Sequence, residues 1–156
     1  DGEVDLTKED CRHLTYRIAS LHKDCFRPQS EEVNTSALVN AMKRGATDII
    51  GHPDDPTFAV NFHTLTDAAK NYGVALEVNA AGIASDGYRK RNPEGLVEML
   101  CLCKKKGVYI TLGSDSHGKD RIADFEDIYK VLSAAEFPNE LILNYHPDLF
   151  FEFVRR

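Results

Sequence analysis

The feature that most constrains this chain is a strict alternation of short apolar runs with segments of helical periodicity, repeated five times. The predicted strands are residues 14–21, 47–50, 74–78, 108–112 and 141–143. The predicted helices are residues 31–44, 61–72, 93–106, 122–135 and 147–156. Because successive strands joined by helices pair in parallel, this order predicts an α/β fold, a parallel sheet or barrel with helices outside it.

The predicted strands are short, continuous apolar runs, which is typical of strands that are covered on both faces. The first predicted long helix instead gathers its apolar side chains on one face, with Ser30 as its N-cap and Gly45 as its stop. No linker, low-complexity tract or shift in composition interrupts the pattern. We therefore expect a single domain over residues 1–156.

Composition narrows the classes of partner. The 156 residues are 42% apolar, which is enough for a real core, and the net charge is -6. That charge argues against nucleic acid or an anionic membrane surface as partners. No apolar run approaches the ~18 residues of a membrane span. The cysteines Cys11, Cys25, Cys101 and Cys103 fit neither a zinc ribbon nor a disulfide framework, so a cytoplasmic protein with reduced thiols is expected.

Polar residues suited to chemistry follow the C-terminal ends of the predicted strands. His22 follows the first strand, His52 the second, and Asp115 with His117 the fourth. In β/α barrels and open α/β sheets this edge carries the active site. Imidazole and carboxylate are ligands of zinc, manganese and iron. A metal-binding hydrolase site is therefore predicted from these four residues.

Simpler interpretations stand beside this one. A single strand-end histidine is more often structural than a ligand, and His146, which precedes a proline, is interpreted as structural. The roles of Glu77 and Asn79 stay open. Arg89 is the candidate contact for a substrate phosphate, because its planar guanidinium matches phosphate oxygens. The flanking basic residues of the same loop are equally well explained as solvated charges.

Three segments together resemble the PHP superfamily, the polymerase and histidinol phosphatase group of metal-dependent phosphoesterases. They are Ala19-Ser-Leu-His22, Ile50-Gly-His-Pro53 and Gly113-Ser-Asp-Ser-His117, each after an apolar strand. The resemblance covers essentially the whole chain. It is greatest to the small stand-alone phosphatases of the superfamily.

The resemblance implies a distorted seven-stranded, TIM-like β/α barrel with a multinuclear site for zinc or manganese, with iron as a further option. His22 and His52 would bind one metal, Asp115 a second and His117 a third. Asp115 and His117 would also be the catalytic residues, and Arg89 would bind the substrate phosphate. The implied reaction is attack of a metal-bound hydroxide on the phosphorus of a small phosphate monoester.

The same comparison implies that part of the site lies elsewhere. The family pattern begins with a His-x-His strand, a later histidine and a bridging glutamate, and none of these is in this sequence. We therefore expect five consecutive β/α units of the barrel, with the N-terminal units absent. A preceding segment or another chain would complete the site, and pairing of exposed sheet edges makes a homo-oligomer an open possibility.

Two other functions are compatible with the sequence. A catalytically inactive or fragmentary PHP domain could serve as a metal-binding or structural module. An amidohydrolase-like barrel would need a different ligand set, with a carboxylated lysine after a strand. No predicted strand here ends in lysine, which favours the phosphoesterase.

Overall fold

The computed structural model describes residues 2–84 and 92–154 of the chain. It shows an α/β fold around a four-stranded parallel sheet whose order follows the chain, β1-β2-β3-β4. The strands are β1 (Ile18–Ala19), β2 (Ile49–Ile50), β3 (Ala75–Asn79) and β4 (Ile110–Gly113). The predicted parallel sheet with helices outside it is thus confirmed, whereas its continuation into a barrel of seven strands stays a prediction.

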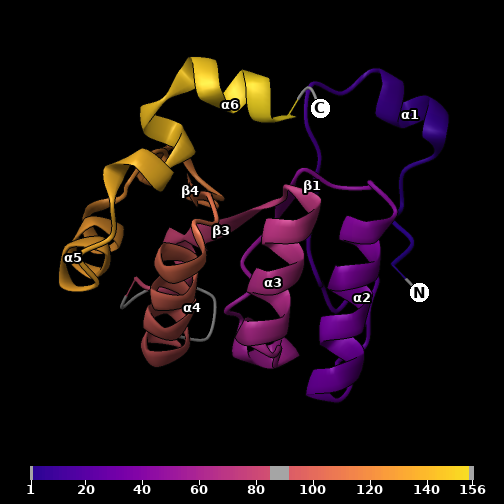
Figure 1. Cartoon of the computed structure of the whole chain (residues 1–156), viewed down its shortest axis with the longest axis horizontal. Helices are drawn as coiled ribbons and strands as arrows, with labels where there is room; N and C mark the ends of the chain where they lie inside the picture. The colour runs from indigo at the N-terminus through magenta and orange to yellow at the C-terminus, as the bar shows by residue number, and fades with distance from the viewer. Residues whose placement is uncertain (1, 85–91, 155–156) are drawn as a thin grey trace.

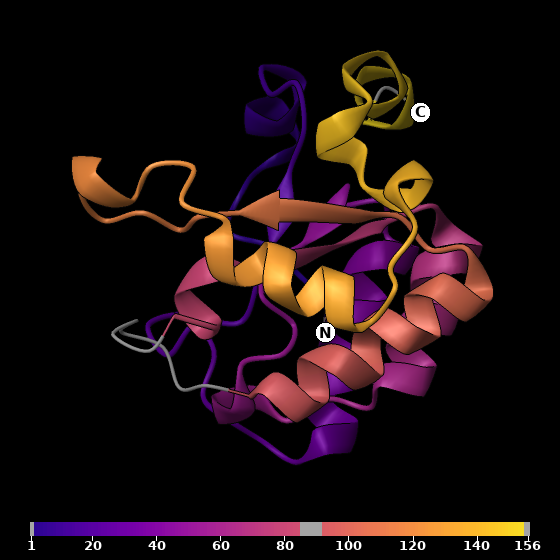
Figure 2. The same cartoon turned by 90° about the vertical axis from the view of Figure 1, so that its left-hand side faces the viewer.

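Helices α2 (Glu31–Lys43), α3 (Phe62–Tyr72) and α4 (Pro93–Lys106) lie side by side along one face of the sheet (Figure 1). Helix α5 (Glu126–Ala134) lies on the same side of β4 (Figure 2). Their apolar faces and the strand residues that point toward them form the main core, which includes Leu38, Leu65, Leu76, Val78, Leu100 and Ile128.

The helix ends explain why the predicted bounds are nearly correct. Ser30 caps α2 by accepting a hydrogen bond from the Val33 N–H, and Asn61 caps α3 in the same way. Helices α3 and α4 end at Gly73 and Gly107, whose φ angles of 65° and 63° favour glycine. These local signals are legible in the sequence because they involve residues only three or four positions apart.

The opposite face of the sheet is covered less completely. Helix α6 (Pro147–Val154) packs there (Figure 2), and its Phe153 and Val154 belong to a second, smaller core cluster together with Ile49 and Ala75. Beyond α6, Ile18 of the edge strand β1 is 51% exposed. The sheet therefore has one fully covered face and one that is partly open among the described residues.

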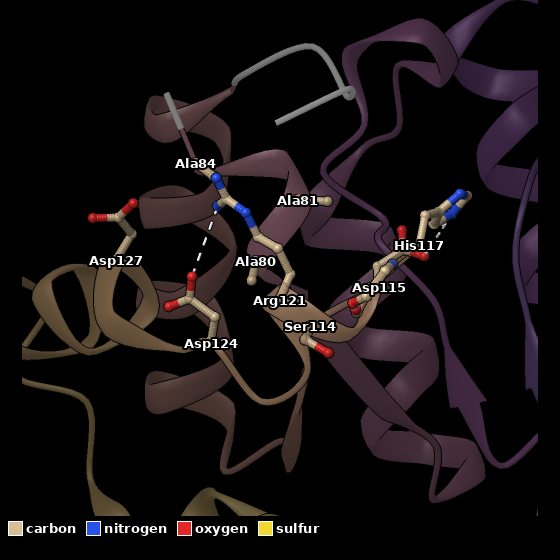
Figure 3. A pocket seen from close by; sticks show the side chains of 11 residues that line it. Ala80, Ala81, Ala84, Ser114, Asp115, His117, Arg121, Asp124 and Asp127 are labelled. Carbon is tan, nitrogen blue, oxygen red and sulfur yellow. Dashed lines mark hydrogen bonds and ion pairs between the residues drawn. The ribbon is translucent and has the colours of Figure 1, made fainter. Parts of the chain in front are cut away.

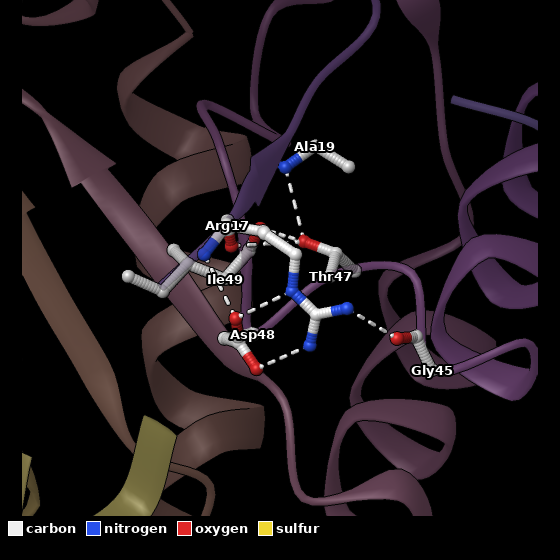
Figure 4. A network of polar contacts seen from close by, with 6 residues as sticks. All are labelled: Arg17, Ala19, Gly45, Thr47, Asp48 and Ile49. Atoms are coloured by element: carbon white, nitrogen blue, oxygen red, sulfur yellow. Dashed lines mark hydrogen bonds and ion pairs between the residues drawn. The ribbon is translucent and has the colours of Figure 1, made fainter. Parts of the chain in front are cut away.

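Side-chain hydrogen bonds shorten the first predicted strand. Only Ile18–Ala19 of residues 14–21 form β1. The Arg17 guanidinium donates two hydrogen bonds of 3.0 Å to the Asp48 carboxylate, and the Arg17 N–H donates a third of 2.8 Å (Figure 4). The Ala19 N–H donates to the Thr47 hydroxyl. Side chains of the β2 lead-in thus accept from the Arg17 and Ala19 N–H groups, while the carbonyls of the same two residues accept from backbone N–H groups of residues 48–51.

The fifth predicted strand, residues 141–143, forms two short 3-10 helices instead, η4 (Asn139–Leu141) and η5 (Leu143–Tyr145), with one isolated parallel bridge to β4. The Asn144 side chain accepts from the Leu112 N–H at 2.7 Å and donates to the Leu112 carbonyl at 3.0 Å. An amide side chain therefore satisfies the edge of β4 where a fifth strand was expected.

A short helix near the N-terminus, α1 (Lys8–Arg12), was not predicted. It begins with a capping box, in which the Thr7 hydroxyl accepts from the Asp10 N–H and the Asp10 carboxylate accepts from the Thr7 N–H.

No helix in residues 2–84 or 92–154 is long and apolar enough to cross a membrane.

Candidate metal site

The predicted site residues lie at one edge of the sheet, where the parallel strands end. His22 follows β1, His52 follows β2, and Asp115 and His117 follow β4. Asn79, the last residue of β3, stands between them in the strand order. Parallel strands bring these distant positions together because all their carboxyl ends point the same way.

His22 and His52 face each other. Their Nε2 atoms are 3.2 Å apart, and the rings meet edge to face with centroids separated by 4.8 Å. The other ring nitrogen of His22, Nδ1, lies 3.1 Å from the Ser20 hydroxyl. His52 is buried, with 7% of its surface exposed. The sequence predicted this pairing of residues but could not predict the orientation of the rings.

The backbone at His52 is unusual. Its φ angle is 32°, in a region that side chains with a Cβ rarely adopt. Its N–H donates a 2.8 Å hydrogen bond to Oε2 of Glu77 on the neighbouring strand. The bond fixes the turn that directs the His52 ring toward His22.

Asp115 also has a positive φ, 48°, and it belongs to the same polar network. Nδ2 of Asn79 lies 3.2 Å from Oδ2 of Asp115 and 3.2 Å from Oε2 of Glu77, so it donates to both carboxylates. Asn79 is 1% exposed. The β3 side chains therefore connect the end of β2 with the end of β4.

His117 lies on the surface. Its Nε2 lies 3.6 Å from Oδ1 of Asp115, and 73% of its side chain is exposed. The structure thus brings the predicted residues together as two pairs, His22 with His52 and Asp115 with His117. Within the described ranges, no three histidine, cysteine, aspartate or glutamate side chains gather closely enough to hold a metal ion.

Two further sequence-based interpretations have different outcomes. Arg89, the predicted phosphate contact, lies outside the described residues. Nε2 of His146 lies 3.2 Å from the Asn139 carbonyl, a contact that fits the structural role expected for it.

A cavity of about 210 Å³ lies beside Asp115 and His117. Ala80, Ala81 and Ala84 line one side of it, and Arg121, Asp124 and Asp127 another. Figure 3 shows the Arg121 guanidinium directed toward Asp124, with Asp115 and His117 on the other side. The ion pair between Arg121 and Asp124 spans 3.7 Å, and both side chains are nearly half exposed.

Sequence reasoning missed the residues of this cavity wall. The segment 118–125 has no strand-end position and no metal-ligand spacing, so nothing marked Arg121 or Asp124 as site residues. Ser20 was also missed, although its position two residues before His22 was a usable signal. The second ring nitrogen of a metal-binding histidine usually has a hydrogen-bond partner, and Ser20 is placed to be that partner for His22.

Comparison with known proteins adds a set of similar sequences, while no protein-family model matches the chain. It is 38% identical over 155 residues to a "Probable phosphatase" of Caldicellulosiruptor saccharolyticus, across 99% of this chain and 64% of that protein. It is 34% identical over 155 residues to a "Probable phosphatase" of Acetivibrio thermocellus, across 99% of this chain and 63% of that protein.

A "Probable phosphatase" of Citrobacter koseri is 33% identical over 154 residues, across 99% of this chain and 62% of that protein. The chain therefore spans slightly less than two thirds of the length of these relatives.

Proposed function

We propose that this chain carries part of the active site of a metal-dependent phosphatase of the PHP type, which hydrolyses small phosphate monoesters. The observation that carries the proposal is the pair of facing imidazoles, His22 and His52, at the ends of adjacent parallel strands. The names of the relatives support phosphatase activity as such. The metal dependence and the PHP type rest on the site residues and on the three motif segments.

The imidazole pair fits a divalent cation. Two nitrogen ligands at about 2.05 Å from a tetrahedral zinc ion stand about 3.3 Å apart. The observed Nε2 to Nε2 separation is 3.2 Å. Ser20 occupies Nδ1 of His22, so that Nε2 is the nitrogen presented to a cation. A hydrogen bond between two neutral rings has the same length, so a direct metal measurement must decide between the two.

Asp115 and His117 would hold further cations across the Glu77 and Asn79 network. Their separation of 3.6 Å lets one carboxylate and one imidazole serve the same centre or adjacent ones. Bound divalent metal lowers the pKa of water and offsets the negative charge of a phosphate. Zinc and manganese are the ions proposed, with iron as a further option, because imidazole and carboxylate accept all three.

The cavity beside Asp115 and His117 supports a small substrate. Its volume of about 210 Å³ is below the range of pockets that take drug-sized ligands. We place the alcohol portion of the monoester there, between the alanines of residues 80–84 and the Arg121 side. Arg89 is retained as the proposed contact of the phosphate.

Further ligands are part of the proposal. Four candidate ligands in two pairs are fewer than a multinuclear centre needs, and the described residues offer no group of three. We propose that a segment preceding these residues, or another chain, supplies the others. The relatives, of which this chain spans less than two thirds, are long enough to contain such a segment.

The same shortage of ligands favours one alternative, a non-catalytic module that binds metal or serves a structural role. It keeps the fold and the histidine pair but does not hydrolyse phosphate esters. The two functions differ in turnover and not in metal binding, so one set of measurements separates them.

The test measures metal content by plasma emission spectrometry and hydrolysis of p-nitrophenyl phosphate, in this chain and in the same chain extended at its N-terminus. We expect the extended protein to bind zinc or manganese and to hydrolyse the ester. His52→Ala and Asp115→Ala should abolish hydrolysis, whereas His63→Ala, at an exposed histidine of α3, should change nothing.

Each contrary result has a defined meaning. Absence of bound transition metal from the extended protein would show that the metal hypothesis is wrong. Stoichiometric metal without hydrolysis would favour the non-catalytic module. Unchanged hydrolysis in His52→Ala and Asp115→Ala would show that the site lies elsewhere.

A further inference from the structure

The middle of the site holds two polar side chains to which the proposed function gives no role. Glu77 and Asn79 lie two residues apart on β3, so they share one face of the sheet. It is the face opposite the main core, because the alternate residues Leu76 and Val78 point toward the helices. Between them they touch one residue of each pair: Glu77 contacts His52, and Asn79 contacts Asp115.

The orientation of the Asn79 amide is fixed by its surroundings. Its Oδ1 accepts a 3.0 Å hydrogen bond from the Ala81 N–H. Its NH2 group must then face Oε2 of Glu77 and Oδ2 of Asp115, each 3.2 Å away. Rotating the amide would bring an oxygen against two carboxylates, which accept but do not donate hydrogen bonds. One buried NH2 group thus holds two carboxylates in place.

Glu77 connects this amide to the other pair. Its Oε2 accepts from the Asn79 NH2 group and, at 2.8 Å, from the N–H of His52. Its Oε1 lies over Gly113 of the adjacent strand, where an added Cβ would overlap the carboxylate. A glycine at this position of β4 leaves the space that the Glu77 side chain occupies.

Both residues at the ends of this network have positive φ angles, which residues with a Cβ rarely adopt. His52 and Asp115 have φ angles of 32° and 48°. Such conformations are unfavourable and persist where the surrounding structure holds them. The hydrogen bonds of Glu77 and Asn79 reach the His52 backbone and the Asp115 carboxylate directly.

We propose that Glu77 and Asn79 are positioning residues, which hold His52 and Asp115 in the arrangement that binds metal without themselves binding metal or substrate. The effect on metal rests on the proposed function, whereas the effect on the His52 turn does not. Residues that orient metal ligands typically contribute about 10–100-fold to metal affinity.

The first test measures the zinc dissociation constant by competition with a chromophoric chelator, in the chain with its N-terminal extension. Glu77→Ala and Asn79→Ala should raise it by about 10–100-fold. Glu77→Gln keeps an oxygen where Oε2 accepts both hydrogen bonds, so it should stay within about fivefold of the parent. A Glu77→Gln variant as weak as Glu77→Ala would mean that the negative charge itself binds metal, which overturns the proposal.

A matched control separates positioning from stability. Asn34 is also a fully buried asparagine, and its amide bonds the carbonyls of Gln29 and Ala59 away from the site. Asn34→Ala should lower the melting temperature and leave the zinc dissociation constant unchanged. If it weakens zinc binding as much as Asn79→Ala does, the role of Asn79 is only structural.

The second test needs no metal. Hydrogen exchange measured by NMR should show a protected His52 amide in the parent chain and in Glu77→Gln, and faster exchange in Glu77→Ala. Gly113→Ala, which displaces the carboxylate without removing it, should also speed that exchange. If the parent binds no zinc, the proposed function is wrong while this comparison still decides the positioning role. An unchanged His52 amide in Glu77→Ala contradicts the positioning role directly.

Discussion

At the scale of single residues, two of the candidate ligands have positive φ angles, which residues other than glycine rarely adopt. Four such residues occur in the described ranges, and two of them, His52 and Asp115, are candidate ligands. Strained backbone of this kind gathers at functional sites, because the surrounding structure must hold it. The sequence correctly placed each of them just after a strand. It did not reveal their strain, which depends on Glu77 and Asn79 on another strand.

Cys103 offers a prediction at the same scale. Burial raises the pKa of its thiol from the ordinary value of 9.0 to about 12. Because the folded pKa exceeds the unfolded one, the stabilising contribution is complete below pH 9 and is lost as the pH rises toward 12. Cys103→Ala should therefore flatten the fall in the free energy of unfolding above pH 9, as measured by urea unfolding.

The exposed Cys101 is the matched control for this prediction. In Cys101→Ala, the free energy of unfolding should depend on pH as it does in the parent. If the free energy of unfolding of Cys103→Ala follows the same curve against pH as that of the parent, the buried thiol does not contribute to the loss of stability above pH 9.

At the scale of elements, polar side chains make hydrogen bonds that the strand pattern predicted between backbone groups. The Asn144 amide satisfies β4 where a fifth strand was predicted. Thr47 and Asp48 do the same for β1. Apolar runs and helix caps were predictable because they depend on residues close in sequence. These side-chain hydrogen bonds were not predictable, because each joins residues about 30 positions apart.

The contact between Arg17 and Asp48 gives a prediction about how β1 is held. Asp48→Ala removes three hydrogen bonds and leaves the Arg17 side chain, which is 24% exposed, without its carboxylate. Hydrogen bonds to charged groups contribute about 1.5–3 kcal/mol each to stability, and partial exposure reduces this, so we expect a loss of about 2 kcal/mol. Urea unfolding measures it.

An exposed ion pair provides the comparison. Glu126 pairs with Lys130 at 3.0 Å, but the two side chains are 80% and 64% exposed. Glu126→Ala should cost less than about 0.5 kcal/mol. Equal losses of unfolding free energy in Asp48→Ala and Glu126→Ala would mean that the contact between Arg17 and Asp48 stabilises the protein no more than an exposed ion pair does.

Across the whole molecule, the sheet is covered by α2–α5 on one face and only partly by α6 on the other. Parallel sheets are found with both faces covered. The strands predicted to be of that kind are mostly buried in β2, β3 and β4, but not in β1. Ile18 on the edge strand and Phe151 on α6 nevertheless remain 51% and 42% exposed.

The open edge leads to a prediction about association. An apolar edge strand promotes pairing with other chains, so the chain alone should self-associate as its concentration rises. Ile18→Lys should reduce this association, as measured by analytical ultracentrifugation. Ile122 is 70% exposed but lies outside the sheet, so Ile122→Lys should have no such effect. A chain that stays monomeric at all concentrations would contradict the prediction.

The two-residue length of β1 also has a consequence for the proposed metal site, because it affects how fast a bound cation would leave. An edge strand with a neighbour on one side opens locally at a lower free energy than the strands inside the sheet. His22 follows this strand, whereas His52 follows β2 and is held by Glu77. His22 would therefore dissociate from the cation before His52 does. The residence time of an ion between them would be set by fraying of one edge and not by unfolding of the core.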